Sequence, residues 1–276
     1  MKKRDRTLPQ RETKGRRSPR PGHIVVCVKA VVTKAPANGA VRSAETAVLN
    51  PFDRPALAMA LSLAKDWGAE VTTLSMGPES VAFTLFETLA MGATRGILLS
   101  DPGLADSDTL ATSTALAAAL KKLAPFDLVL FGARTADSDT GQVGPQTAVM
   151  CDIPAVTGAL SVKKKGALIR VERIIDEFRE VYEMELPAAL TVHPSAPKPP
   201  DIPLAGLEDA FEKRHVEFWN LDDLALKSEL TGKAGSPTAV LSMSRVIRER
   251  KCRFLAGTVE EQAEALLSHI RESGHI

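Results

Sequence analysis

The residues best suited to bind a ligand lie at 132–147, in the segment GARTADSDTGQVGPQT. This segment directly follows DLVLF at 127–131, a short apolar run typical of a strand buried on both faces. Ligands of open α/β sheets bind where strands end and helices begin, so we expect a phosphate or a nucleotide here. Three glycines would let the backbone approach such a ligand closely: Gly132, Gly141 and Gly144.

The same segment contains a candidate helix start. Asp139 or Thr140 can cap a helix that ends before residue 153, and the amides of residues 140–143 would then point outward with the helix dipole behind them. Asp137 and Asp139 are unusual neighbours for an anion. They either shape the loop by accepting backbone N–H groups or accept hydrogen bonds from a ribose or base, and an ordinary polar loop is the remaining alternative.

Several other chemistries lack their sequence signature. No G-x-x-x-x-G-K-[ST] loop is present and no G-x-G-x-x-G follows the first strand, which excludes P-loop NTPases and Rossmann dinucleotide enzymes. The five histidines are scattered, none at metal-ligand spacing from Cys or Glu, and no nucleophile motif is present. We therefore expect neither a metal site nor catalytic acid–base residues.

A series of β-then-α units would position the loop. Strands are expected at four places: 23–29, 70–76, 96–99 and 127–131. The intervening segments have helical spacing of apolar residues. Asn50 and Pro51 open the first helix, Gly68 ends it, and Ser107 or Asp108 caps the third. Four such units in succession predict a doubly wound α/β fold with a parallel sheet.

The character of the chain changes after residue 154. We expect three antiparallel strands at 156–162, 168–173 and 180–185. A final buried strand at 186–192 and a proline-rich segment at 193–206 follow. A polar helix at 207–215 and an amphipathic helix at 259–270 follow. These segments predict a small antiparallel extension of the sheet and a C-terminal arm.

Charge and cysteine content bound the setting of the protein. The net charge is +1, but residues 1–20 hold nine basic and two acidic residues, so the rest of the chain is mildly acidic. With almost no apolar residues, this tail should be disordered, and a role in binding nucleic acid or membrane is the weaker alternative. No apolar run is long enough to span a membrane. Three scattered cysteines fit a cytoplasmic protein: Cys27, Cys151 and Cys252.

The loop at 132–147 resembles the nucleotide-binding loop of electron-transfer flavoprotein beta subunits, which is roughly G-R-Q-A-x-D-x-D-T-x-Q-V-G-P-Q. Further matches follow in family order: HIVVCVK at 23–29, LNPFDRPALAMAL at 49–61, VTTLSMGP at 71–78, LAMGATRGILLSD at 89–101, DSDTLATSTALAAAL at 106–120 and LPAALTV at 186–192. The resemblance implies a flavodoxin-like domain of the adenine-nucleotide alpha-hydrolase kind, paired with an FAD-carrying alpha subunit as a heterodimer.

The resemblance also implies the ligand contacts. They come at the ends of strands or just after them, and are Cys27, Asn50, Pro51, Phe52, Asp53, Met76, Asp137, Ser138, Asp139, Thr140, Gly141, Gln142, Val143, Gly144, Pro145, Gln146 and Thr147. In this family the protein positions the cofactor and tunes its potential, while the flavin supplies the chemistry. The chain is therefore expected to be an electron-carrier subunit that oxidises NADH only in complex with the alpha subunit.

Beta subunits of this family hold either a structural AMP or, in flavin-bifurcating members, a second FAD that reacts with NADH. Two motifs resemble the bifurcating members: D-T-x-Q-V-G-P at 139–145 and G-x-x-G-S-P-T at 232–238. They favour FAD over AMP. The chain departs from the family pattern at 28–33, at 104–109 and at Thr135. The alternative of a non-bifurcating carrier with a structural AMP stays open.

The resemblance also implies a division of the chain and its partners. Residues 1–21 form the tail, 22–192 the nucleotide-binding domain, 193–206 a loop that docks a dehydrogenase or reductase, and 207–276 an arm that wraps the alpha subunit. Ile202 and Leu204 would be the apolar anchors of the docking loop. A mere linker at 193–206 is the alternative, and a stand-alone adenine-nucleotide-binding stress-type protein, which would lack the arm, is the other function considered.

Overall fold

The structure is a computed structural model that describes residues 22–32, 45–165, 168–176, 178–197, 201–202, 204–213, 215–242 and 252–274. The chain divides into two compact units, Met1–Ala239 and Val240–Ile276. The basic tail expected at 1–21 lies outside the described residues. Among the residues that are described, no helix is both long and apolar enough to cross a bilayer.

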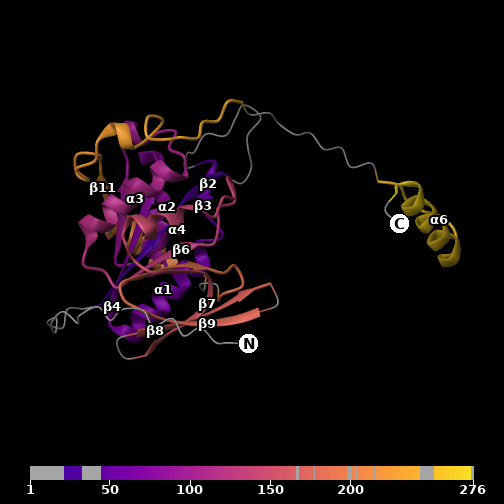
Figure 1. The fold of residues 1–276 in the computed structure, drawn as a ribbon, viewed down its shortest axis with the longest axis horizontal. Helices are drawn as coiled ribbons and strands as arrows, with labels where there is room; N and C mark the ends of the chain where they lie inside the picture. Colours follow the sequence, from indigo (N-terminus) through magenta and orange to yellow (C-terminus); the bar gives the residue numbers. More distant parts are fainter. Residues whose placement is uncertain are drawn as a thin grey trace, which may run out of the picture. The chain divides into compact units, whose positions relative to one another are not determined.

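The first unit is built on a nine-stranded, mainly parallel sheet (Figure 1), as the repeated β-then-α pattern predicts. In spatial order its strands are β11 (Val216–Trp219), β5 (Arg95–Leu99), β4 (Ala69–Met76), β1 (Gly22–Cys27), β6 (Leu128–Gly132), β10 (Ala188–Val192), β7 (Ala155–Lys165), β8 (Leu168–Ile175) and β9 (Phe178–Glu185). All pairs from β11 to β7 are parallel, and β7 to β9 form the antiparallel extension.

Helices cover both faces of this sheet. Alternate residues of β1 explain why: Ile24 and Val26 belong to one buried apolar cluster, whereas Val25 and Cys27 belong to the other. The first cluster includes residues of α1 (Arg54–Trp67) and α2 (Phe83–Ala90), and the second includes residues of α3 (Thr109–Leu123) and α4 (Val143–Met150). With few aromatics, this core consists mainly of Ala, Val, Leu and Ile side chains.

The order of the strands creates a switch point at β1. The chain passes from β1 to β4 and β5 on one side, and then returns to β6 on the other side of β1. The chain connections on the two sides of β1 therefore diverge at its carboxyl end. Open α/β sheets bind their ligands at such a switch point.

Several local expectations need correction. A short two-stranded sheet adds to the expected elements: Ala30–Val32 (β2) pairs antiparallel with Ala47–Leu49 (β3). Helix α1 begins at Arg54 rather than at Pro51, because residues 51–53 form a turn, and it ends at Gly68 with a φ of 63°, as expected. The second helical segment is split into a 3-10 turn, Glu79–Val81 (η1), and α2. Asp108 is the N-cap of α3, as expected.

The chain beyond β10 differs most from the expected arm. Helix α5 (Leu204–Lys213) stacks Phe211 on Phe86 of α2, with ring centroids 5.0 Å apart, and β11 then joins the edge of the main sheet beside β5. Two short 3-10 turns, Pro102–Leu104 (η2) and Ser228–Leu230 (η3), complete this unit. Residues 207–239 are thus part of the α/β unit, because they bury apolar side chains such as Trp219 and Leu221 in its core.

The second unit contains one helix, α6 (Val259–Glu272), within its described part. Thr258 and Glu261 form a reciprocal capping box at its N-terminus. None of its residues is buried, and Val259, Leu266 and Leu267 are exposed apolar side chains. An amphipathic helix of this kind is stable only when its apolar face packs against something else.

Candidate functional site

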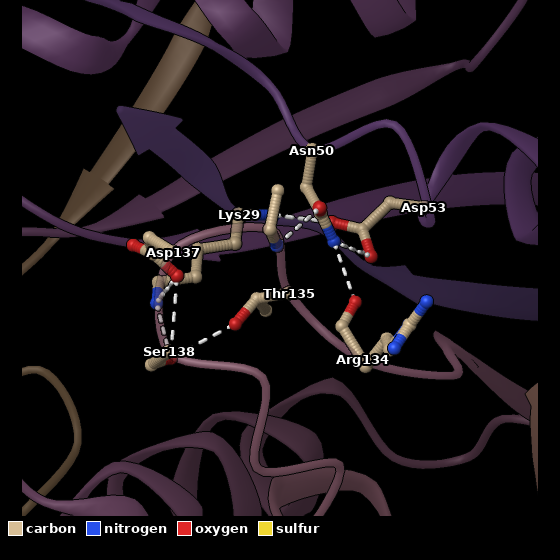
Figure 2. Close-up of polar contacts among 8 residues, drawn as sticks. Lys29, Asn50, Asp53, Arg134, Thr135, Asp137 and Ser138 are labelled. Carbon is tan, nitrogen blue, oxygen red and sulfur yellow. Dashed lines mark hydrogen bonds and ion pairs between the residues drawn. The ribbon is translucent and has the colours of Figure 1, made fainter. Parts of the chain in front are cut away.

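Three separate segments meet at the carboxyl end of β1. They are Lys29, just after β1; the turn at residues 50–53 that precedes α1; and the loop at 134–138 that follows β6 (Figure 2). This is the switch point of the sheet. The ligand-binding position predicted from the motif GARTADSDTGQVGPQT and the position predicted from sheet topology therefore coincide.

Asn50 joins these segments through its side chain. Its Nδ2 donates to Asp53 Oδ1 at 2.8 Å and to the carbonyl O of Arg134 at 2.9 Å, and its Oδ1 accepts from the N–H of Ala136 at 3.2 Å. The residue is fully buried. Its amide is therefore occupied by protein groups, and Asn50 holds the loop in place instead of capping α1 or presenting its side chain to a ligand.

Asp53 links the Asn50 side chain to the end of β1. Its Oδ2 accepts from the backbone N–H of Lys29 at 2.8 Å, so the carboxylate connects the end of β1 to Asn50. Burial raises the pKa of Asp53 to about 7, against the opposing effect of the Lys29 and Asn50 N–H donors. Burial also raises the pKa of the neighbouring Cys27 thiol well above its usual value, and the charge of Asp53 adds to this. Cys27 is therefore a small apolar residue of the core beneath the site.

The two aspartates of the loop are each paired with a cation. Lys29 Nζ lies 2.8 Å from Asp137 Oδ1, and Arg134 lies 3.3 Å from Asp139. The Arg134 guanidinium is also stacked 4.5 Å from the centroid of the Phe52 ring. These pairs balance the carboxylate charges, which explains how two aspartates can stand in a loop suited to an anion.

The helix start expected at Asp139 or Thr140 is wrong. Asp139 and Gly141 have φ values of 54° and 64°, so this stretch is not helical, and α4 begins only at Val143. The N-cap residue is Gln142, whose side chain makes no capping bond. Residues 138–142 are exposed and form the outer part of the loop.

Two of the three loop glycines serve packing inside the protein. A Cβ on Gly132 would overlap the Asp53 carboxylate and lie 2.7 Å from the carbonyl O of Phe52. A Cβ on Gly144 would lie 2.9 Å from the methyl group of Thr191 and 3.1 Å from the Phe131 ring. The interpretation that both glycines make room for a ligand is therefore replaced by one in which they let the turn and α4 pack closely. Only Gly141 is required by its own backbone conformation.

The remaining predicted contacts fall into two groups. Pro51 and Phe52 follow β3, and Met76 is the last residue of β4; Pro51 is exposed, and Phe52 and Met76 are partly buried. Thr147 is fully buried, and its hydroxyl donates to the carbonyl O of Val143 within α4. Pro145 and Gln146 are also part of α4, where Gln146 Oε1 accepts from Ser113 of α3. The side chains of Gln146 and Thr147 are thus engaged by protein groups.

The sequence reasoning missed two site residues, Lys29 and Arg134. A charge argument could have found them, because a loop that carries two carboxylates and still attracts an anion needs cations nearby. Lys29 ends the first apolar run and Arg134 lies inside the quoted loop. In the described part of the chain, no cluster of three or more His, Cys, Asp or Glu side chains is arranged to hold a metal ion.

The two expected docking residues differ in exposure. Leu204 is the first residue of α5 and is 82% exposed. Ile202 is partly buried and packs against the core cluster on the α1 and α2 face. Leu204 is therefore available to a partner protein, whereas Ile202 anchors the segment to its own domain.

Comparison with known proteins matches most of the α/β unit to one family. The family model described as the electron transfer flavoprotein domain matches residues 38–224. The electron transfer flavoprotein subunit beta of Thermoanaerobacterium thermosaccharolyticum is 35% identical over 236 residues, which is 86% of this chain and 90% of that protein. The caffeyl-CoA reductase-Etf complex subunit CarD of Acetobacterium woodii is 36% identical over 257 residues, 90% of this chain and 98% of the relative. The acryloyl-CoA reductase electron transfer subunit gamma of Anaerotignum propionicum is 34% identical over 264 residues, with the same two coverages.

Proposed function

The chain belongs to the electron transfer flavoprotein family as a beta subunit, and we propose that it binds FAD at the crevice formed by Lys29, residues 50–53 and the loop at 134–142. The observation that carries this proposal is the Asn50 tether. It fixes the start of the loop over the carboxyl end of β1 through bonds to Arg134 and Ala136. A loop held in advance loses less conformational entropy on binding a ligand.

The groups at the crevice suit the diphosphate of a dinucleotide. Residues 138–142 are exposed, and the N–H of Asp139 already donates to the carbonyl O of Thr135 at 3.0 Å. The other backbone N–H groups of this stretch would face phosphate oxygens. Lys29 and Arg134 offset the charges of Asp137 and Asp139, so the two carboxylates do not leave the loop with a net negative charge that would repel a phosphate. The Phe52 ring and the aliphatic part of Arg134 would border an aromatic ring system. When bound, the flavin supplies the two-electron chemistry with NADH.

The choice of FAD over AMP rests on two motifs. The segments 139–145 and 232–238 resemble motifs of flavin-bifurcating beta subunits. The first contains Gln142, which is bonded to Thr109 of α3, and the second is bonded to Asp108 at the start of α3. By their names, one similar protein is a subunit of a caffeyl-CoA reductase-Etf complex and another is the electron transfer subunit gamma of an acryloyl-CoA reductase. We propose by extension that this chain serves an acyl-CoA-type dehydrogenase or reductase in the cytoplasm. A carrier with a structural AMP is the alternative outcome of the experiment below.

The alpha subunit and the dehydrogenase would use different surfaces. We assign the exposed Leu204 at the start of α5 to the dehydrogenase. We assign α6 to the alpha subunit, because its exposed apolar side chains Val259, Leu266 and Leu267 need a partner to cover them. The C-terminal arm is accordingly confined to Val240–Ile276, the second compact unit.

The decisive experiment measures the flavin content of the heterodimer after co-expression with its alpha subunit, followed by anaerobic addition of NADH. Two FAD per heterodimer with bleaching by NADH are expected for the bifurcating type. One FAD with bound AMP and no bleaching would establish the simple carrier. A heterodimer with no adenine nucleotide in the beta subunit would refute the proposed site.

The site itself is tested with Lys29→Met, and with Lys65→Met at an exposed position of α1 as the matched control. Removing one cation near the phosphates should weaken FAD and AMP binding about threefold to tenfold, and more strongly at low salt. Binding of adenosine, which lacks phosphate, should change little. Equal losses for AMP and adenosine would show that Lys29 does not act on the phosphate.

A further inference from the structure

A segment far along the chain is tied to the start of α3. This strap, defined as residues 231–238, contains the motif G-x-x-G-S-P-T. The Thr231 hydroxyl donates to the carbonyl O of Gly103 at 3.1 Å, and the N–H of Gly232 donates to Ser107 Oγ at 3.0 Å. Gly232 has a φ of 57°, and a Cβ there would overlap the carbonyl O of Gly103. The strap fits this position only because glycine has no side chain.

Asp108 is the centre of the attachment. Its own N–H donates to Ser236 Oγ at 2.8 Å, and its Oδ2 accepts from the N–H of Thr238 at 3.0 Å. Its Oδ1 accepts from the N–H groups of Leu110 and Ala111 and so caps α3. One carboxylate therefore serves the helix with one oxygen and the strap with the other. Burial opposes ionisation, but these N–H donors outweigh it and hold the pKa of Asp108 below its usual range.

The first two turns of α3 in turn hold the ligand loop. Thr109 Oγ1 donates to Gln142 Oε1 at 3.1 Å. One turn later, Ser113 Oγ lies 3.1 Å from Gln146 Oε1 and 3.3 Å from the carbonyl O of Val143. A continuous series of contacts thus runs from the strap through Asp108 and Thr109 to Gln142, the residue at which the loop enters α4.

We propose that Asp108 and Ser236 are positioning residues for the nucleotide: by clamping the first turn of α3, they fix Gln142 and the downstream end of the ligand loop. This inference rests on the proposed nucleotide site. The strap acts without touching the ligand, and it places the motif at 232–238 in a direct structural relation to the loop at 139–145.

The two functions of Asp108 can be separated by substitution. Asp108→Asn keeps an N-cap side chain, since Asn caps helices as well as Asp does, but presents an NH2 group to the N–H of Thr238. Ser236→Ala releases the strap from the opposite side. Asp101→Asn is the matched control, because Asp101 also caps its own turn through Gly103 N–H and accepts the N–H of Leu221 from the same C-terminal segment. Within the part of the chain that the structure describes, Asp101 makes no direct hydrogen bond to Asp108, Thr109 or Gln142.

The variants are compared in the co-expressed heterodimer by titrating FAD and AMP into protein stripped of nucleotide. Asp108→Asn and Ser236→Ala should each weaken binding about fivefold, the effect of one lost hydrogen bond, whereas Asp101→Asn should bind as the wild type does. Thr109→Val should give a similar loss, and combining it with Asp108→Asn should add little, because both act through one series of contacts. Equal weakening in Asp101→Asn, or full additivity in the double variant, would overturn the positioning role.

A ligand-free measurement keeps this inference independent of the proposed function. Hydrogen exchange of the Gln146 amide, whose N–H donates to the carbonyl O of Gln142, should be faster in Asp108→Asn and Ser236→Ala than in wild type and in Asp101→Asn. Unchanged exchange would overturn the inference even if the wild type binds FAD. Conversely, faster exchange in a protein that binds neither FAD nor AMP would refute the nucleotide site while leaving the mechanical link in place.

Discussion

The buried carboxyl of Asp53 should make stability depend on pH in an unusual direction. It is 4% exposed and accepts N–H groups from Lys29 and Asn50, yet burial raises its pKa to about 7. The negative charge of Asp137 reinforces the rise and Lys29 opposes it. The perturbation is to vary the pH from 5 to 8 and to compare the wild type with Asp53→Asn, which cannot titrate.

The magnitude follows from the difference between the folded and unfolded pKa values. An unfolded Asp has a pKa of about 3.9, so the folded chain binds this proton more tightly between about pH 4 and pH 7. The resulting stabilisation is complete below about pH 4, is lost as the pH rises to about 7, and does not change above that. At about 1.4 kcal/mol per pH unit, the free energy of unfolding should fall by roughly 2–3 kcal/mol between pH 5 and pH 7 because of this group.

The assay is urea unfolding of the chain at several pH values, with the wild type and the variant measured side by side. The difference between their free energies of unfolding should change by about 2–3 kcal/mol from pH 5 to pH 7 and stay level from pH 7 to pH 8. Asp66→Asn, at an exposed position of α1, controls for the loss of one carboxyl and should leave the curve parallel to that of the wild type. A difference between wild type and Asp53→Asn that stays constant within about 0.5 kcal/mol from pH 5 to pH 8 would refute the reasoning. The two N–H donors would then keep Asp53 ionised throughout.

Three further outcomes are expected. Asn50→Ala should destabilise the site by about 2–4 kcal/mol, because it leaves the Arg134 carbonyl and the Ala136 N–H without their partner. It should also speed hydrogen exchange of the Ala136 amide. Exchange at the wild-type rate would contradict the claim that Asn50 holds the loop. Gly144→Ala should lower the free energy of unfolding by about 1–3 kcal/mol through overlap with Thr191, and Gly141→Ala by about 1 kcal/mol through its positive φ alone; equal nucleotide loss at full stability would restore the original view of Gly144. Leu204→Ala should slow electron delivery to the dehydrogenase without changing flavin reduction by NADH. Slowing of both steps would contradict the assignment of Leu204 to the docking surface.

Local patterns predicted the elements of the fold well. Buried runs such as IVVC in β1 and DLVLF at β6 can be recognised because a parallel strand needs apolar residues on both faces. Helix ends at Gly68 and Asp108 were found because their signals lie within a few residues. The short pair β2 and β3 was missed, since three-residue strands carry almost no periodicity.

The site could be located but not resolved from the sequence. Asn50 has the type and position of an N-cap, and only contacts to Arg134 and Ala136, more than 80 residues away, decide that it serves as a tether. Gly144 likewise has the same local pattern whether it faces a ligand or Thr191. Such distinctions depend on which distant segment packs against a residue, and spacing along the chain does not encode that.

The ligand loop is secured at its two ends by different parts of the chain. Asn50 holds its beginning through Arg134 and Ala136, and Thr109 holds its end at Gln142, while residues 138–141 between them remain exposed. Binding a nucleotide then requires ordering of only the middle of the loop, so less of the interaction energy is spent on conformational entropy. The same arrangement predicts that loosening either end weakens binding independently, because the two anchors share no contact. A combined Asn50→Ser and Thr109→Val variant should therefore show additive losses in nucleotide affinity, whereas Asp108→Asn combined with Thr109→Val should not. Non-additive losses in the Asn50→Ser and Thr109→Val variant would mean that the loop responds as one rigid body.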